Sequence, residues 1–172
     1  DSGEKIVVDS IEKLKSLSKS AGNTYFVMRH GQTDHNVRQE WNADRKVPDP
    51  LTELGVSQVI EKAKSFDEDL DVIIVSPFSR TKETARIFLE TKGLKTEVIE
   101  DERIREWEVG QEFNNRSFKD YFEVRNASDD RYNFKASDGE SYIDIIRRAG
   151  EFLYDLETKY QGKKILIITH GA

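Results

Sequence analysis

Short apolar runs interrupt a largely polar chain, and they predict buried strands. Three of these runs, each of four residues and rich in β-branched or aromatic types, are Tyr25–Met28, Val72–Val75 and Ile165–Ile168. A weaker candidate is Thr96–Ile99. Runs that are short and apolar throughout are typical of strands covered on both faces, as in a parallel sheet.

The stretches between these runs show helical spacing. One helix is expected from Leu51 to about Phe66, with Thr52 as its N-cap. A second is expected over Ser79–Lys92, where Gly93 supplies a stop signal. Ala85, Phe88 and Leu89 share one face of this second helix.

The clearest helical pattern runs from Ser141 to Tyr160. Ser141-x-x-Asp144 resembles a capping box, in which each residue satisfies a backbone donor near the other. The apolar residues that repeat at helical spacing are Ile143, Ile146, Ala149, Phe152, Leu153 and Leu156.

Strands that alternate with helices predict an α/β fold, a three-layer sandwich with a mostly parallel central sheet and helices on both faces. The length of 172 residues fits one domain. We assign residues 24–172 to this domain and residues 1–23 to an N-terminal appendage or a remnant of a larger protein. Residues 111–138 are polar and aromatic without a clean period, which indicates an insertion or lid.

Composition and charge narrow the class of protein. The chain contains no cysteine, so disulfides and thiolate chemistry do not arise. No run approaches the roughly 20 apolar residues of a membrane span, and no signal-peptide pattern opens the chain, so we expect a cytoplasmic protein without membrane contact. A net charge of −6 disfavours broad nucleic-acid binding, although a local cluster of cations would still allow it.

Distinctive polar residues follow three of the expected strands. They are Arg29-His30-Gly31, the block from Ser76 to Arg80, and Thr169-His170-Gly171. Ligands of parallel α/β sheets bind beyond the carboxyl ends of the strands, so two histidines and two arginines should meet at one rim. Each of these residues alone would be an ordinary packing or surface residue, and only their coincidence indicates a site.

Such a cluster suits phosphoryl transfer. A neutral imidazole attacks phosphorus near neutral pH, and the planar fork of arginine binds two phosphate oxygens. The leaving oxygen needs a proton, for which Glu106, downstream of the fourth strand, is a candidate. His30 and His35 lack the i, i+4 spacing of a helical zinc site, so we expect no metal.

Motifs spread over residues 24–172 resemble those of the histidine phosphatase superfamily, also called the phosphoglycerate mutase-like family. Gln32 stands where that family usually has Glu in Arg-His-Gly-Glu-Thr. The matching segments are Arg29-His-Gly-Gln-Thr33 with Asn36, Leu51-Thr-Glu-Leu-Gly-Val-Ser-Gln58, Ser76-Pro-Phe-Ser-Arg-Thr-Lys-Glu-Thr-Ala85, Gly139-Glu-Ser141 and Thr169-His-Gly171.

The resemblance implies that His30 accepts a phosphoryl group and that Glu106 acts first as acid and then as base for water. It implies no metal and no organic cofactor, and a small phosphorylated substrate; the oligomeric state stays open. The residues implied to bind the phosphoryl group are Arg29, His30, Asn36, Arg80 and His170.

The chain also departs from the family pattern. Trp41-Asn-Ala-Asp-Arg45 stands where the family commonly has Arg-x-Gln-Gly, which affects substrate contacts. The chain ends two residues after His170, so we expect one face of the fold to be incomplete. Residues 6–18 faintly resemble a segment of class I isoleucyl-type aminoacyl-tRNA synthetases, which would make the chain a piece of a larger enzyme.

Three functions remain open, with a phosphomonoester hydrolase first. The resemblance favours this interpretation, because cofactor-dependent mutases of the family usually have a longer insertion between the acid and the second histidine than the stretch from Glu106 to His170 allows. That insertion helps to close their site. The alternatives are a phosphoglycerate mutase-type phosphotransferase and a phosphate-binding or regulatory domain without turnover.

The 111–138 segment carries candidate substrate contacts at Arg116, Tyr121 and Arg125. Alternating aromatics and cations would suit a nucleotide or RNA surface. Acidic residues of the same segment, such as Asp129 and Asp130, nearly cancel those cations, which favours ordinary lid packing.

Overall fold

The computed structural model describes residues 22–136 and 138–171. Its sheet has four parallel strands in the order β1-β4-β2-β3. The strands are β1 (Thr24–Arg29), β2 (Val72–Val75), β3 (Glu97–Glu100) and β4 (Lys164–Thr169). All four expected strands are therefore confirmed to within one residue at each end. Residues 1–21 of the expected N-terminal appendage lie outside the described residues.

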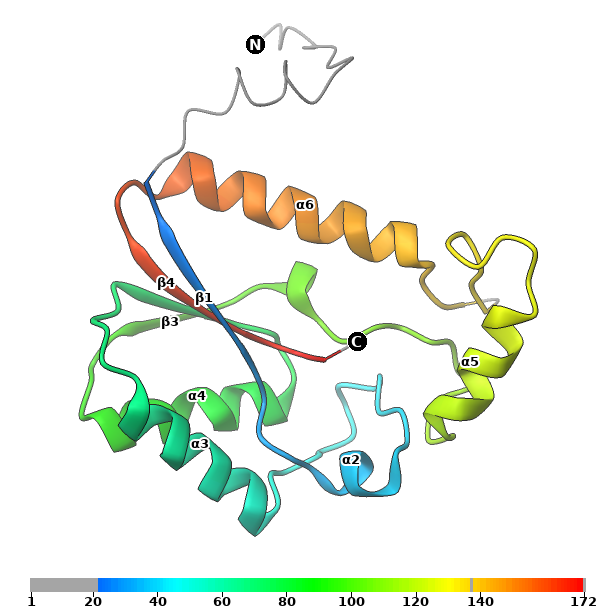
Figure 1. The fold of residues 1–172 in the computed structure, drawn as a ribbon, viewed down its shortest axis with the longest axis horizontal. Helices are drawn as coiled ribbons and strands as arrows, with labels where there is room; N and C mark the ends of the chain where they lie inside the picture. Colours follow the sequence, from blue (N-terminus) through cyan, green and yellow to red (C-terminus); the bar gives the residue numbers. More distant parts are fainter. Residues whose placement is uncertain (1–21, 137, 172) are drawn as a thin grey trace, which may run out of the picture.

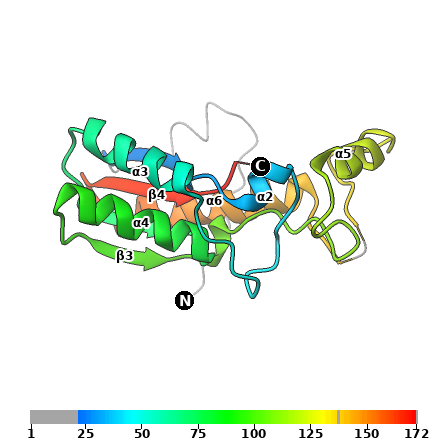
Figure 2. The same cartoon turned by 90° about the horizontal axis from the view of Figure 1, so that it is seen from below.

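Helices cover both faces of this sheet, as the alternation of elements predicts. Helices α3 (Glu53–Ser65) and α4 (Ser79–Lys92) lie on one face, and α6 (Tyr142–Lys159) lies on the other (Figures 1 and 2). The three-layer α/β sandwich is thus confirmed. None of the described helices is both long and apolar enough to cross a membrane.

The expected helix boundaries are set by the expected capping residues. The Thr52 hydroxyl accepts a hydrogen bond from the Gly55 amide at 3.0 Å, which satisfies a donor in the first turn of α3. Gly93 ends α4 with φ of 66°, in the left-handed region where glycine carries no Cβ penalty. Ser141 and Asp144 form the reciprocal capping box at the start of α6.

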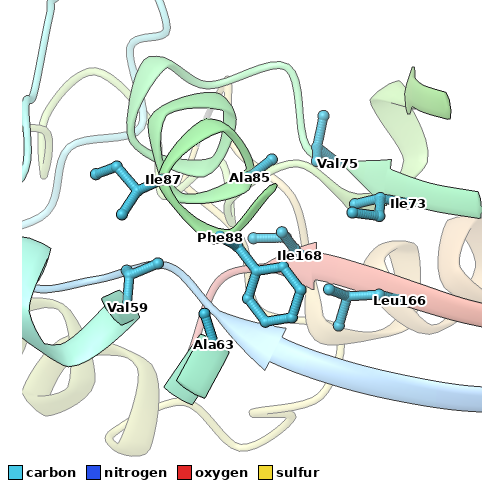
Figure 3. Close-up of a cluster of buried hydrophobic side chains, with 9 residues drawn as sticks. All are labelled: Val59, Ala63, Ile73, Val75, Ala85, Ile87, Phe88, Leu166 and Ile168. Carbon is cyan, nitrogen blue, oxygen red and sulfur yellow. The ribbon is translucent and has the colours of Figure 1, made fainter. Parts of the chain in front are cut away.

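Successive residues of the two central strands face opposite layers, because side chains alternate along a strand. Ile73 and Leu166 point towards α3 and α4 (Figure 3), whereas Val72 and Ile165 point towards α6. The cluster under α3 and α4 is Val59, Ala63, Ile73, Val75, Ala85, Ile87, Phe88, Leu166 and Ile168. The cluster under α6 is Val72, Ile74, Ile104, Phe152, Leu156, Ile165 and Ile167.

The apolar stripe expected on α6 is only partly buried. Phe152 and Leu156 belong to the core, but Ile146 is 52% exposed and Leu153 is 46% exposed. Helical spacing selects the residues that share a face, but the width of the neighbouring layer decides how many of them it covers.

Three short helices were not expected from the pattern. They are α2 (Asp34–Arg38), the 3₁₀ turn η1 (Glu102–Ile104) and α5 (Phe118–Asn126), which lies within the 111–138 segment. The 111–138 segment packs against the rest of the domain in a third cluster of buried apolar residues, called here the aromatic cluster. Its buried members are Trp41, Trp107, Val109, Phe113, Tyr121 and Ala136.

Candidate active site

The parallel register brings His30 and His170 to one end of the sheet. Arg29 at the end of β1 pairs with Thr169 at the end of β4, and the His30 amide donates to the Thr169 carbonyl at 3.1 Å. The two imidazole rings, which follow these strands, have centroids 5.2 Å apart. The expected meeting of two histidines that are 140 residues apart in the sequence is present in the structure.

Glycine is required where the loop after His30 crosses the start of α3. A Cβ on Gly31 would lie 2.6 Å from the Gly55 carbonyl oxygen, and a Cβ on Gly55 would lie 2.2 Å from the Gln32 carbonyl oxygen. The Gly31 amide donates to the Thr84 hydroxyl at 3.1 Å, which ties the same loop to α4. These contacts fix the backbone that carries His30.

Arg80 lies at the centre of the site. It occupies the first turn of α4, is 3% exposed, and its Nε donates to Nε2 of His30 at 3.2 Å. Its Nη2 lies 3.1 Å from Nδ1 of His170 and 3.2 Å from Oε2 of Glu106. One guanidinium therefore contacts both histidines and the acid, which are the residues expected to carry the chemistry.

The carboxylate of Glu106 is held from two sides. Its Oε1 accepts from the Trp107 amide at 3.0 Å, while its Oε2 faces Arg80 and lies 3.3 Å from Nδ1 of His170. Burial raises the pKa of this carboxyl, but the hydrogen bond and charge of His170 and the charge of Arg80 outweigh burial and lower the pKa to about 2.

The imidazole of His30 is set up as a neutral base. Burial, followed by the charge of Arg80, lowers the pKa of His30 to about 3. Nδ1 donates to the Gly31 carbonyl at 2.7 Å, so in the neutral ring the lone pair lies on Nε2, where Arg80 donates. Near pH 7 this arrangement leaves Nε2 unprotonated.

His170 is also held by hydrogen bonds at both ring nitrogens. Its Nε2 lies 2.7 Å from the Ser76 hydroxyl, and its Nδ1 faces Arg80 and Glu106. Burial lowers the pKa of His170 despite the opposing effect of Glu106. Ser76, at the start of the Ser-Pro block, thus orients the second histidine.

Two adjoining cavities open over this cluster and share Arg29, Asn36 and Phe118 as walls. One, of about 190 Å³, reaches Arg80 and Glu106, and the other, of about 590 Å³, reaches His30. The exposed side chain of Arg29 can therefore meet an anion from either side.

Asn36 shows how a short helix can position a ligand-binding group. Its Oδ1 accepts from the Thr33 amide at 3.1 Å, which leaves its amide nitrogen to donate into the cavities. Five of the six expected residues line these two cavities: Arg29, His30, Asn36, Arg80 and Glu106. The sixth, His170, lines neither cavity but contacts Arg80 and Glu106 directly.

The sequence reasoning missed two residues that contact Arg80. The Asn42 carbonyl accepts from Nη2 at 3.1 Å, and Oδ2 of the buried Asp49 lies 3.8 Å from Nη1. Asp49 also accepts from Nδ1 of His35 at 2.9 Å. Asn42 lies in the stretch Trp41–Arg45 that departs from the family pattern, whereas Asp49 lies beyond that stretch and had no signal in the sequence.

The candidate lid contacts occupy different environments. Tyr121 is fully buried in the aromatic cluster, where its ring packs against Trp41 and Trp107. Arg116 pairs with Asp120 at the surface, and Arg125 stacks over Trp107. The side chains of this segment that line the cavity with Arg80 and Glu106 are Phe118 and Phe122.

Tyr121 is therefore a packing residue of the aromatic cluster, and its side chain has no exposed surface for direct substrate contact.

His30, Glu106 and His170 also satisfy the spacing of a metal site, with one ligand atom from each lying within 4.8 Å of the others. Two histidines and a carboxylate are a common zinc donor set. The guanidinium of Arg80, however, contacts all three groups and already supplies positive charge at that point. The donor set therefore does not fit a divalent cation while Arg80 is charged.

Comparison with known proteins agrees with this geometry. A family model of the histidine phosphatase superfamily (branch 1) matches residues 25–172, and the chain belongs to that superfamily.

Among curated relatives, a 2,3-bisphosphoglycerate-dependent phosphoglycerate mutase of Rhizobium etli is 31% identical over 163 residues, covering 87% of this chain and 75% of that protein. A metal-independent phosphoserine phosphatase of Arabidopsis thaliana is 24% identical over 162 residues, covering 85% of this chain and 63% of the relative. Phosphoglycerate mutase-like protein 4 of the same plant is covered to 65% of its length. The chain thus spans between 63% and 75% of the length of these three curated relatives.

Solved structures share the fold. Bacillus stearothermophilus YhfR superposes with a TM-score of 0.73 at 26% identity, covering 87% of this chain and 74% of that one. A phosphoserine phosphatase from Entamoeba histolytica, solved with 3-phosphoglyceric acid, gives a TM-score of 0.72 at 22% identity with the same coverage. The second likeness concerns the fold alone.

Proposed function

We propose that this chain hydrolyses phosphomonoesters through a phosphohistidine on His30. The observation that carries the proposal is the unprotonated Nε2 of His30, which faces the same guanidinium that holds Glu106. A neutral nucleophile, fixed cations and a carboxyl group are the three components that a covalent phosphoryl transfer needs.

The proposed reaction has two steps, transfer of the phosphoryl group to His30 and its transfer from His30 to water. In the first, Nε2 of His30 forms a bond to phosphorus as the ester oxygen leaves, and Glu106 gives that oxygen a proton. In the second, Glu106 takes a proton from water, the water oxygen bonds to phosphorus, and the P–N bond breaks to release inorganic phosphate. Arg29, Arg80, Asn36 and His170 hold the phosphoryl oxygens in both steps.

The proton on Glu106 must arrive with the substrate. The carboxyl is ionised in the free protein, where its pKa is about 2. A phosphate ester monoanion brings its own proton, and the negative phosphoryl group beside the carboxylate raises the pKa of Glu106. Substrate binding thus prepares the acid.

A mutase reaction is the second candidate, and one observation favours it: the relative at 31% identity is named a phosphoglycerate mutase. In that reaction the phosphohistidine passes its phosphoryl group to a bound product instead of to water. Turnover would then depend on a bisphosphate primer.

The test is phosphate release from a panel of phosphorylated metabolites, nucleotides and phosphopeptides, measured on the wild type and His30→Ala. We expect the wild type to release phosphate and His30→Ala to release none. We also expect an acid-labile phosphoprotein to form in the wild type and in the control variant His35→Ala. Turnover only with a bisphosphate primer would indicate the mutase. No release from any substrate by either protein would instead favour a phosphate-binding or regulatory domain.

A further inference from the structure

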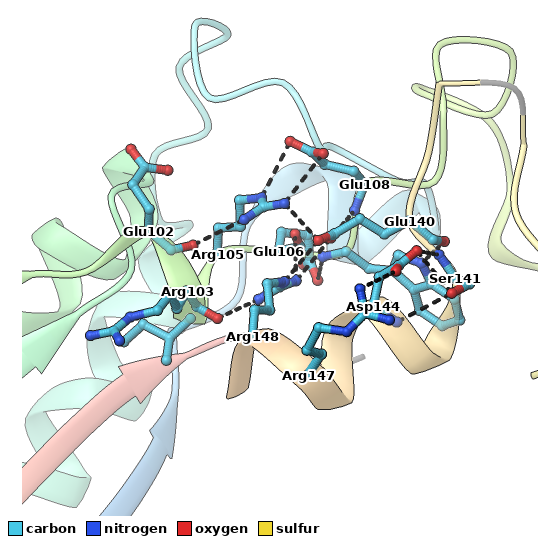
Figure 4. A network of polar contacts seen from close by, with 12 residues as sticks. Glu102, Arg103, Arg105, Glu106, Glu108, Glu140, Ser141, Asp144, Arg147 and Arg148 are labelled. Atoms are coloured by element: carbon cyan, nitrogen blue, oxygen red, sulfur yellow. Dashed lines mark hydrogen bonds and ion pairs between the residues drawn. The ribbon is translucent and has the colours of Figure 1, made fainter. Parts of the chain in front are cut away.

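Glu106 lies on a segment without regular secondary structure. The turn η1 ends at Ile104, and residues 105–110 form neither helix nor strand. No helix or strand fixes the position of this acid, so hydrogen bonds with other parts of the chain must hold it. Two residues far along the chain supply many of those contacts (Figure 4).

Arg148 on α6 donates hydrogen bonds to the main chain just before this segment and at Glu106 itself. Its Nη1 donates to the Arg103 carbonyl at 2.6 Å, and its Nη2 reaches the Glu106 carbonyl at 3.4 Å. The Arg148 side chain is only 12% exposed. It does not line either cavity of the site, so it reaches the acid through the backbone.

Glu140 holds Arg148 and the same segment together. Its carboxylate accepts from Nε and Nη2 of Arg148 at 2.9 and 3.0 Å and from Nη2 of Arg105 at 2.6 Å. The Glu140 amide donates to the Glu108 carbonyl at 2.7 Å, and its own carbonyl accepts from the Trp107 indole at 2.9 Å. Glu140 is thus bonded to both sides of Glu106.

We propose that Glu140 and Arg148 are positioning residues that hold Glu106 against Arg80 and His170, so that its carboxyl can protonate the leaving oxygen. This inference rests on the proposed function. Glu140 and Arg148 form a nearly buried ion pair, and neither contacts the carboxylate of Glu106. A positioning role explains why this pair lies next to the main chain of Glu106. Lysine cannot reproduce the planar fork of Arg148, because it is a point charge on a flexible stem.

Arg148→Lys keeps the charge and removes the fork, and Arg147→Lys is its matched control. Arg147 is the preceding residue of α6, is 66% exposed, and bonds Asp144 instead. An alkyl phosphate needs a proton on its leaving oxygen. p-Nitrophenyl phosphate needs it less, because its leaving group, p-nitrophenolate, is a stable anion.

We compare kcat/KM for an alkyl ester with kcat/KM for an aryl ester and take the ratio of the two. We expect Arg148→Lys and Glu140→Gln to lower this ratio about tenfold or more. The upper bound is the roughly 10² to 10⁴ that a general acid contributes. Arg147→Lys should leave the ratio unchanged. In a Glu106→Gln background, Arg148→Lys should change it no further. An unchanged ratio in Arg148→Lys and Glu140→Gln, whether or not kcat/KM falls equally for both esters, would overturn the proposal.

A second readout does not need turnover. The carboxyl carbon of Glu106, followed by NMR, should titrate at higher pH in Arg148→Lys than in the wild type, because the carboxylate then moves away from Arg80 and His170; Arg147→Lys should match the wild type. If no ester is turned over but the Glu106 titration moves, the proposed function fails and the positioning role stands. An unmoved titration overturns the positioning role in either case.

Discussion

Nε of Arg80 lies 3.2 Å from Nε2 of His30, so the proposed phosphate-binding cation is hydrogen-bonded to the proposed nucleophile in the free protein. The contact holds the imidazole in one tautomer and lowers the pKa of His30, after the larger effect of burial. Among the described residues, Nη1 of Arg80 has no hydrogen-bond partner, and it is buried 3.8 Å from Oδ2 of Asp49.

Replacing Arg80 with lysine should therefore lower kcat strongly, although the substitution keeps the positive charge. A lysine amine cannot contact His30, His170 and Glu106 at once, and it loses the bidentate geometry for phosphate. We expect kcat in Arg80→Lys to fall by about 10² to 10³, as for loss of a fixed transition-state donor. The matched control is Arg86→Lys on the same helix, where an exposed arginine pairs with Glu90, and its rate should stay at the wild-type value. A comparable loss in both variants would contradict the role of Arg80.

The pH dependence of kcat/KM should follow the substrate. His30 is neutral above about pH 3 and Glu106 is ionised above about pH 2, so these groups do not change charge between pH 4 and 8 in the free protein. The proton for the leaving group then comes from the ester monoanion, which ionises near a pKa of about 6.

We therefore expect kcat/KM to fall about tenfold per pH unit above that value. Rate profiles for two esters with different second pKa values provide the measurement, and the fall should move with the ester. A fall at the same pH for both esters would assign it to a group of the protein.

Stability should decrease in acid, and His30 should account for part of the decrease. The pKa of His30 is lowered from 6.5 to about 3 on folding, so the unfolded chain binds a proton first as the pH falls. The contribution of His30 is complete above pH 6.5 and is lost progressively as the pH falls towards 3, with a slope of up to about 1.4 kcal/mol per pH unit.

Urea denaturation in phosphate-free buffer from pH 7 to 4 should show this slope, and His30→Asn should flatten it. If the free energy of unfolding depends on pH with the same slope in both proteins, the imidazole of His30 is not buried in its neutral form in solution.

The sequence predicted the parts of this molecule that local pattern controls. The short, β-branched run Val72–Val75 predicted a buried strand, and the spacing of Ser141 and Asp144 predicted a helix cap from four residues. The meeting of His30 with His170 also followed from a simple rule, because parallel strands end at one edge.

Residues that act through long-range contacts left no such signal. Asp49 reaches Arg80 from a loop, and nothing in its neighbours along the chain indicates that contact. Tyr121 was a candidate for substrate contact because it alternates with cations, yet the ring is buried between two tryptophans from distant segments. Ile146 fits the helical period of α6 but finds no layer to cover it.

Metal removal provides a final prediction, because His30, Glu106 and His170 have the spacing of a zinc site while Arg80 contacts all three. Dialysis against a chelator should leave phosphate release unchanged, since the fixed guanidinium supplies the positive charge that a metal would bring. Arg80→Ala should lose activity and, with the guanidinium gone, bind Zn²⁺ through the two imidazoles and the carboxylate. Isothermal titration with Zn²⁺ should show one site in Arg80→Ala and none at this cluster in the wild type. Activity that is lost on chelation of the wild type and restored by Zn²⁺ would contradict this account of the site.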